Sequence, residues 1–257
     1  MIASVWYLCV MGSKALEFKR ELEIFRTEGD AAVQFFYAWQ TIDAVAGNDR
    51  SVHRALNKAP LFWNTSLGAL QTATLVTLGR VFDPDPNNHS ITRLLSLAHG
   101  NLELFSKEAL AERKRELSAD ADQWLPKYLQ SVYVPNSGDF RRLKRYIAIR
   151  RRTYEDNYRP LRHKFFAHRS ASESIDVAAL FAKTNIRELQ QLLVFLRRMH
   201  EALWQLFFNG NKPTLRPARH SMNRMRELPS LSPRQAQLQE RMTHETEQLV
   251  RSLGYSN

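Results

Sequence analysis

Apolar side chains recur every three or four residues along much of this chain, and the clearest case lies between residues 185 and 210. The apolar residues there are Ile186, Leu189, Leu193, Leu196, Met199, Leu203 and Phe207. This spacing places them on one face of an α-helix. Asn185 and Glu188 fit a capping box at the helix start, and Gly210 fits a left-handed cap at its end. No alternating run is long enough for a sheet, so the pattern predicts an all-α chain.

Residues that end helices divide the rest of the chain into further segments. Helical stripes predict helices over residues 14–25, 31–46, 61–82, 91–97, 102–117 and 120–132. Ser90 is expected to cap one of these helices, and Asp139 to cap a long basic helix that runs toward Tyr158. Pro160 must then kink that helix or begin a new one, because proline cannot continue the hydrogen-bond ladder.

The composition changes after Lys212, where four prolines punctuate a polar, basic stretch. We interpret residues 1–12 as an apolar N-terminal segment or a misassigned start. Residues 13–211 are interpreted as one helical domain, and residues 212–257 as a basic linker followed by a helix. The apolar face of this last helix is narrow and consists of Met242, Leu249 and Leu253. We expect it to pack on a partner or on a second copy of the chain.

The charge balance points to an anionic partner. Lysine and arginine number 37 against 26 acidic residues, which gives a net charge of +11. Nucleic acid, an acidic membrane surface and an acidic protein all fit such a balance. The alternative is a solvated basic surface with no partner. Glycine numbers only 9, which argues against a sandwich or barrel with its many turns.

Cysteine usage and the N-terminus indicate a cytoplasmic protein. The chain has one cysteine, Cys9, so no internal disulfide can form and no cysteine-based zinc site exists. This fits a reducing compartment. The apolar stretch over residues 1–11 is shorter than the roughly 20 residues that cross a bilayer. We therefore expect no membrane span.

The most informative window covers residues 140–169. Its basic residues are Arg141, Arg142, Lys144, Arg145, Arg150, Arg151, Arg152, Arg159, Arg162, Lys164 and Arg169. The aromatic residues among them are Tyr146, Tyr154, Tyr158, Phe165 and Phe166. A basic surface can follow phosphates, and exposed aromatic rings can stack on bases. The alternative is a solvated basic face whose aromatic rings point into the core.

Within this window, the residues from Tyr158 to Arg169 read Tyr-Arg-Pro-Leu-Arg-His-Lys-Phe-Phe-Ala-His-Arg. They resemble the HEPN superfamily, whose signature is Arg, a polar residue, a short and mostly apolar spacer, then His. Arg162, His163 and His168 match this order, although Asn is commoner than His at the polar position. The run from Gly79 to Asp83 is also similar to a helix-ending turn of abortive-infection members.

The resemblance covers residues 31–208 and implies an up-and-down helical bundle of HEPN type. It also implies a metal-independent RNA endonuclease of toxin type, acting on tRNA or mRNA. The implied setting is phage defence by abortive infection, or a toxin–antitoxin system. The implied partners are a second copy of the chain in a homodimer and an antitoxin or another defence-system component.

The chemistry of cleavage suits these residue types. A histidine can give or take a proton near neutral pH, and a guanidinium stays charged and binds phosphate through two hydrogen bonds. We assign His168 to acid–base catalysis and Arg162 to stabilising the phosphate in the transition state. His163 is expected to orient the phosphate or assist proton transfer. The predicted RNA contacts are Arg151, Arg152, Tyr158, Arg159, Lys164 and Arg169.

Helix geometry constrains this site. Six residues at about 100° each place Arg162 and His168 far apart around a straight helix. Either the helix ends near Ala167 or the site is completed across a dimer. No metal or cofactor is expected, because His163 and His168 are off a common face and no phosphate-binding glycine loop is present.

Two other functions and one structural explanation remain open. The chain could be a non-catalytic helical module that binds RNA or protein, as some HEPN members are. It could instead associate with a membrane surface through its basic helix and apolar N-terminus. In the structural explanation, Arg162 pairs with Glu155 or Asp156, and His168 caps a helix C-terminus.

Overall fold

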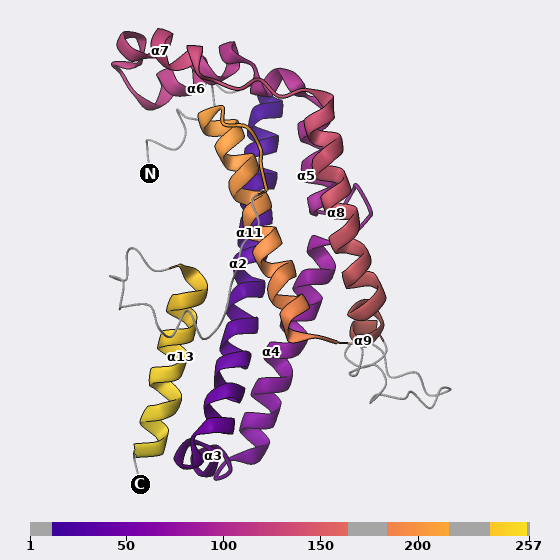
Figure 1. The fold of residues 1–257 in the computed structure, drawn as a ribbon, viewed down its shortest axis with the longest axis vertical. Coiled ribbons are helices and arrows are strands. Elements are labelled where there is room, and N and C mark those ends of the chain that lie inside the picture. The colour runs from indigo at the N-terminus through magenta and orange to yellow at the C-terminus, as the bar shows by residue number, and fades with distance from the viewer. Residues whose placement is uncertain (1–11, 164–183, 216–236, 256–257) are drawn as a thin grey trace. The chain divides into compact units, whose positions relative to one another are not determined.

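The computed structural model describes residues 12–163, 184–215 and 237–255, and all regular elements in these ranges are helices (Figure 1). The prediction of an all-α chain is therefore confirmed. The described residues form two compact units. The first comprises residues 12–27, 80–156 and 185–215, and the second comprises residues 28–79, 157–163, 184 and 237–255. The predicted domain division at residue 211 stays a prediction.

Helix α2 (Ser13–Asn48) is one continuous helix of 36 residues, where the sequence predicted two. Gly29 lies in the expected gap between them, but a single glycine inside a helix costs only about 1 kcal/mol. Unlike proline, glycine also keeps its backbone donor. Residues 26–30, which the sequence left between two predicted helices, therefore continue one helix.

Between the helices predicted over residues 31–46 and 61–82 lies a helix that the sequence did not predict, α3 (Arg50–Leu56). Asp49 caps it, because its carboxylate accepts hydrogen bonds from the backbone N–H of Ser51 at 2.9 Å and Val52 at 3.4 Å. Helix α4 (Pro60–Val81) follows. Pro60 is the first residue of this helix. The backbone N–H at that position has no partner within a helix, so proline's lack of it costs nothing.

The next helices lie close to their predicted places. Ser90 caps α5 (Ile91–Gly100), as expected, by accepting from the backbone N–H of Arg93. The single helix expected over residues 102–117 is two elements instead, the 3₁₀ turn η1 (Leu102–Phe105) and helix α6 (Lys107–Leu117). Ser106 divides them because serine caps a helix better than it continues one. Helix α7 is Ala121–Gln130.

Asp139 does not cap the basic helix α8 (Ser137–Asn157), so that prediction is wrong. It lies in the first turn, where its buried carboxylate accepts hydrogen bonds from the Tyr133 hydroxyl at 2.7 Å and the Asn136 N–H at 3.0 Å. Burial raises the pKa of this carboxyl, but these hydrogen bonds and the charge of Arg142 bring it below the ordinary value of 3.8. Asp139 therefore stays charged in the first turn of α8.

The predicted stripe is confirmed in α11 (Ile186–Asn209), where every member except Ile186 is buried. The Asn185 side chain caps this helix by accepting from the Arg187 N–H at 2.8 Å. Gly210 ends it with φ of +60°, the left-handed conformation that favours glycine.

Aromatic rings from four elements form the core of the first unit. Phe18 of α2 lies 4.9 Å from Phe207 of α11 and 5.4 Å from Phe105 of η1, centroid to centroid. Phe105 in turn lies 5.5 Å from Phe140 of α8. All four side chains are buried. This cluster fixes which face of α8 points inward.

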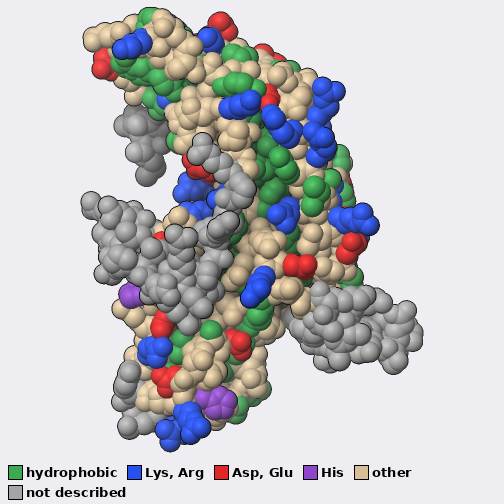
Figure 2. Space-filling view, in the orientation of Figure 1, with side chains coloured by type: hydrophobic (Ala, Val, Ile, Leu, Met, Phe, Trp, Pro, Cys, Tyr) green, Lys and Arg blue, Asp and Glu red, His purple; other side chains and the backbone are tan. Residues whose placement is uncertain are grey.

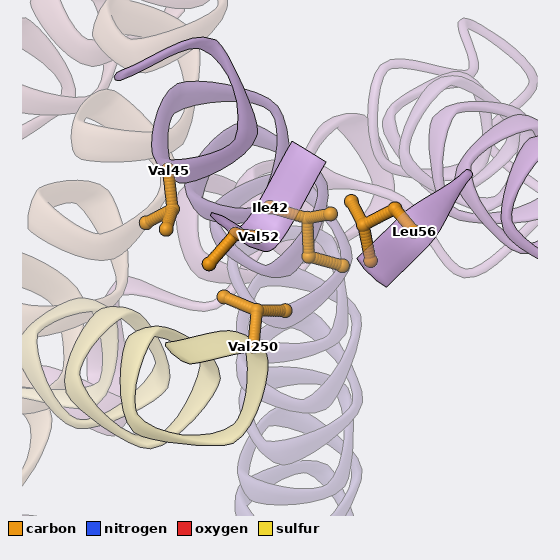
Figure 3. Close-up of a cluster of buried hydrophobic side chains, with 5 residues drawn as sticks. All are labelled: Ile42, Val45, Val52, Leu56 and Val250. Carbon is orange, nitrogen blue, oxygen red and sulfur yellow. The ribbon is translucent and has the colours of Figure 1, made fainter. Parts of the chain in front are cut away.

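The core of the second unit joins the last helix to the N-terminal half of the chain. Helix α13 (Leu238–Tyr255) packs on α3, and Val250 lies among Ile42, Val45, Val52 and Leu56 (Figure 3). Of the face that we expected a partner or a second copy to cover, Leu253 packs against this cluster within the chain. Leu249, predicted on that face, is largely exposed.

None of the helices in the described ranges is both long enough and apolar enough to cross a membrane.

Candidate functional site

The signature residues follow a break in the helix that leads to them. Helix α8 ends at Asn157, and the short helix α9 (Arg159–Leu161) begins beyond it. Pro160 causes the break, because its nitrogen has no hydrogen to donate one turn back. Tyr158 and Leu161 are buried on either side of the proline. They anchor the turn that carries Arg162.

Arg162 and His163 are in direct contact. The Arg162 backbone N–H donates to the Tyr158 carbonyl at 2.9 Å, so Arg162 continues the helical turn. The Arg162 Nη2 lies 2.9 Å from the His163 Nε2, and both side chains are partly buried. A guanidinium can only donate, so Nε2 accepts in this contact. The imidazole proton is then on Nδ1, and His163 holds the guanidinium in place.

The rest of the predicted signature lies outside the described residues. His168, the predicted acid–base group, is among these, and so are Lys164 and Arg169. The expected helix end near Ala167 also falls there. The roles of these residues therefore remain predictions from the sequence.

Tyr158 is fully buried, with 0% of its surface exposed. A ring inside the core offers no face on which a base could stack, so this structure does not support the predicted contact of Tyr158 with RNA. Tyr154 is buried too and stacks on Phe82 at 5.7 Å between centroids. Among the aromatic residues of this window that the structure describes, Tyr146 has an exposed ring, with 43% of its surface open.

The predicted arginine contacts differ in how accessible they are. Arg152 and Arg159 are exposed, and Arg152 makes a surface ion pair with Asp156 at 3.5 Å. Arg151 is partly buried and donates through Nη2 to the Thr92 hydroxyl. That contact leaves less of the Arg151 guanidinium for an RNA phosphate.

The first unit contains a charged cluster that sequence reasoning missed. Glu21 of α2 is almost fully buried, and both of its carboxylate oxygens lie 2.9 Å from the His89 Nδ1. The Arg93 Nε donates to Glu21 at 3.0 Å, and the Arg93 Nη2 donates to Glu17 at 2.8 Å. The only local signal was the spacing of Glu17 and Glu21, which places two carboxylates on one helix face.

Within the described ranges, no group of three or more histidine, cysteine and acidic side chains is placed to hold a metal ion.

The all-α fold agrees with the comparison with protein families. The AbiU2 family model, a HEPN type, matches residues 15–228. The chain therefore belongs to the AbiU2 family of HEPN-type abortive-infection domains. No curated protein and no solved structure matches it.

Proposed function

We propose that this protein is a metal-independent RNA endonuclease that acts in the cytoplasm during abortive infection. Its substrate would be tRNA or mRNA, and its active form would be a homodimer with an antitoxin or another defence component as regulator. The observation that carries the proposal is the 2.9 Å contact between Arg162 and His163. It joins the first two signature residues in a chain of the AbiU2 family.

Each signature residue has a task in this reaction. Cleavage requires removal of a proton from the 2′-hydroxyl, stabilisation of the charged phosphorane and protonation of the leaving 5′-oxygen. Arg162 would bind the phosphorane oxygens, because its guanidinium is permanently charged and already oriented by His163. His168 would transfer the protons, a role worth about 10²–10⁴-fold in rate.

The test is cleavage of total cellular RNA by purified protein in excess EDTA. We expect the wild type to leave 2′,3′-cyclic phosphate ends. His168→Ala should cut at least about 100-fold more slowly. Arg162→Ala should lose about 10²–10³-fold, because a charged donor to the transition state is removed. The matched control is His53→Ala, which removes an exposed histidine of α3 and should cut like the wild type.

Two results would contradict the proposal. Equal cleavage by the wild type and His168→Ala would place the activity elsewhere. Intact RNA with every variant, together with salt-sensitive RNA binding, would instead support the non-catalytic binding module.

A further inference from the structure

Helix α8 presents a row of arginines on the face opposite its core contacts. Its buried face consists of Phe140, Leu143, Ile147 and Tyr154. At 100° per residue, Arg141, Arg145 and Arg152 fall within about 40° of one another on the other side. All three are exposed, and they span roughly 16 Å along the helix axis. Figure 2 shows lysine and arginine side chains gathered over α8.

Two of these arginines have no counter-charge within the part of the chain that the structure describes. Other basic residues of α8 have partners, since Arg142 pairs with Asp139 and Arg150 donates to Gln191 at 3.4 Å. In the described ranges, Arg141 and Arg145 make no ion pair and no side-chain hydrogen bond. Like charges four residues apart on a helix repel each other. An anionic ligand would remove that repulsion.

Two exposed apolar side chains lie on one flank of the arginine row, since at 100° per residue Ile149 falls about 40° and Tyr146 about 100° from Arg145 around the helix. Tyr146 has 43% of its surface exposed, and Ile149 has 61%. Proteins that bind unpaired nucleic acid combine arginines, which contact the phosphate backbone, with an exposed aromatic ring. The ring can stack on a free base. In a duplex the bases are already stacked on each other and offer no free face.

We propose that the outer face of α8 is a binding surface for single-stranded RNA. Arg141, Arg145 and Arg152 contact the phosphates, and Tyr146 stacks on a base. The choice of RNA as the ligand rests on the proposed function. The inference adds the place on the protein where an unpaired strand binds. It differs from the contacts predicted from sequence, because Tyr146 replaces Tyr158 as the stacking residue.

The experiment measures binding of a short single-stranded 2′-O-methyl RNA by fluorescence anisotropy, with full-length protein. This probe cannot be cut by attack of its own 2′-oxygen, so binding is read independently of cleavage. Each phosphate contact to a single strand contributes about 0.7 to the slope of log affinity against log salt. Arg141→Ala/Arg145→Ala should therefore bind about 20-fold more weakly at ~0.1 M salt and lower that slope by about 1.4.

The matched control is Arg50→Ala/Arg54→Ala. These two arginines are also exposed and four residues apart, on α3, and they carry the same charge. This variant should bind nearly as well as the wild type. Tyr146→Ala should lose about tenfold in affinity, whereas Tyr146→Phe keeps the ring and should bind normally.

Several results would overturn the inference. One is an equal loss in both double variants, and another is normal binding by Tyr146→Ala. A third is tighter binding of the matching duplex than of the single strand. A fourth is binding to phosphatidylserine vesicles that depends on Arg141 and Arg145 while RNA does not bind.

If the α8 variants behave as expected but wild-type protein cuts no RNA, the endonuclease proposal fails and this surface stands. If RNA is cut and the α8 variants bind normally, only the surface is wrong.

Discussion

At the scale of single residues, the Glu21 carboxylate is a polar group inside the first unit that depends on hydrogen-bond partners. It is almost fully buried, and two basic side chains contact it, His89 at 2.9 Å and Arg93 at 3.0 Å. A buried carboxylate needs such partners, because removal from water is costly for a charge. The cluster ties the segment after α4 to helix α2.

We expect Glu21→Gln to lower the free energy of unfolding by about 2 kcal/mol, because hydrogen bonds to a charged group are lost and Arg93 keeps its charge. The measurement is urea unfolding, with a lower midpoint and an unchanged slope. Glu23→Gln is the control, since the exposed Glu23 side chain pairs with Arg26 at 3.8 Å and loss of that surface pair should cost little stability. Equal stability of the two variants would show that the cluster contributes nothing.

At the scale of elements, the docking of α13 on α3 depends on close backbone approach. A Cβ atom at Gly254 would lie 2.7 Å from the Ser51 Oγ and 3.3 Å from the Val52 backbone nitrogen. The same contact includes an ion pair between Arg251 and Asp49 at 3.0 Å. A side chain at Gly254 would push the two helices apart at this end.

Gly254→Val should therefore loosen α13, and its backbone amides should exchange with deuterium faster than in the wild type. Gly47→Ala is a useful contrast, because nothing lies within 4 Å of the added Cβ and alanine favours helix by about 1 kcal/mol. That variant should exchange no faster. Unchanged protection of α13 in Gly254→Val would mean that this close approach does not hold the helix.

At the scale of the whole molecule, the proposed homodimer decides how the site is assembled. If Arg162 and His168 come from different copies, a mixture of Arg162→Ala and His168→Ala proteins contains mixed dimers with one intact site. After subunit exchange, half of the dimers are mixed, so about a quarter of wild-type cleavage should return. RNA cleavage by the equimolar mixture measures this. If the mixture stays as inactive as each variant alone, both residues act within one copy.

The sequence by itself determined the helical class, most helix ends and the family signature. Ser90, Asn185 and Gly210 act where they were expected, because a cap depends on backbone groups only a few residues away. The same locality explains the break at Pro160. The contact of Arg162 with His163 joins adjacent residues, so their pairing is also a short-range property.

The tertiary structure decided what depends on residues far apart in the chain. The pairing of Glu21 with His89 joins positions 68 residues apart, and no local pattern encodes it. The packing of α13 on α3 has the same origin. Burial separates Tyr158 from Tyr146, although both are tyrosines in one basic window. The sequence places an aromatic ring on a helix, but only the packed neighbours determine whether that ring faces the core or the solvent.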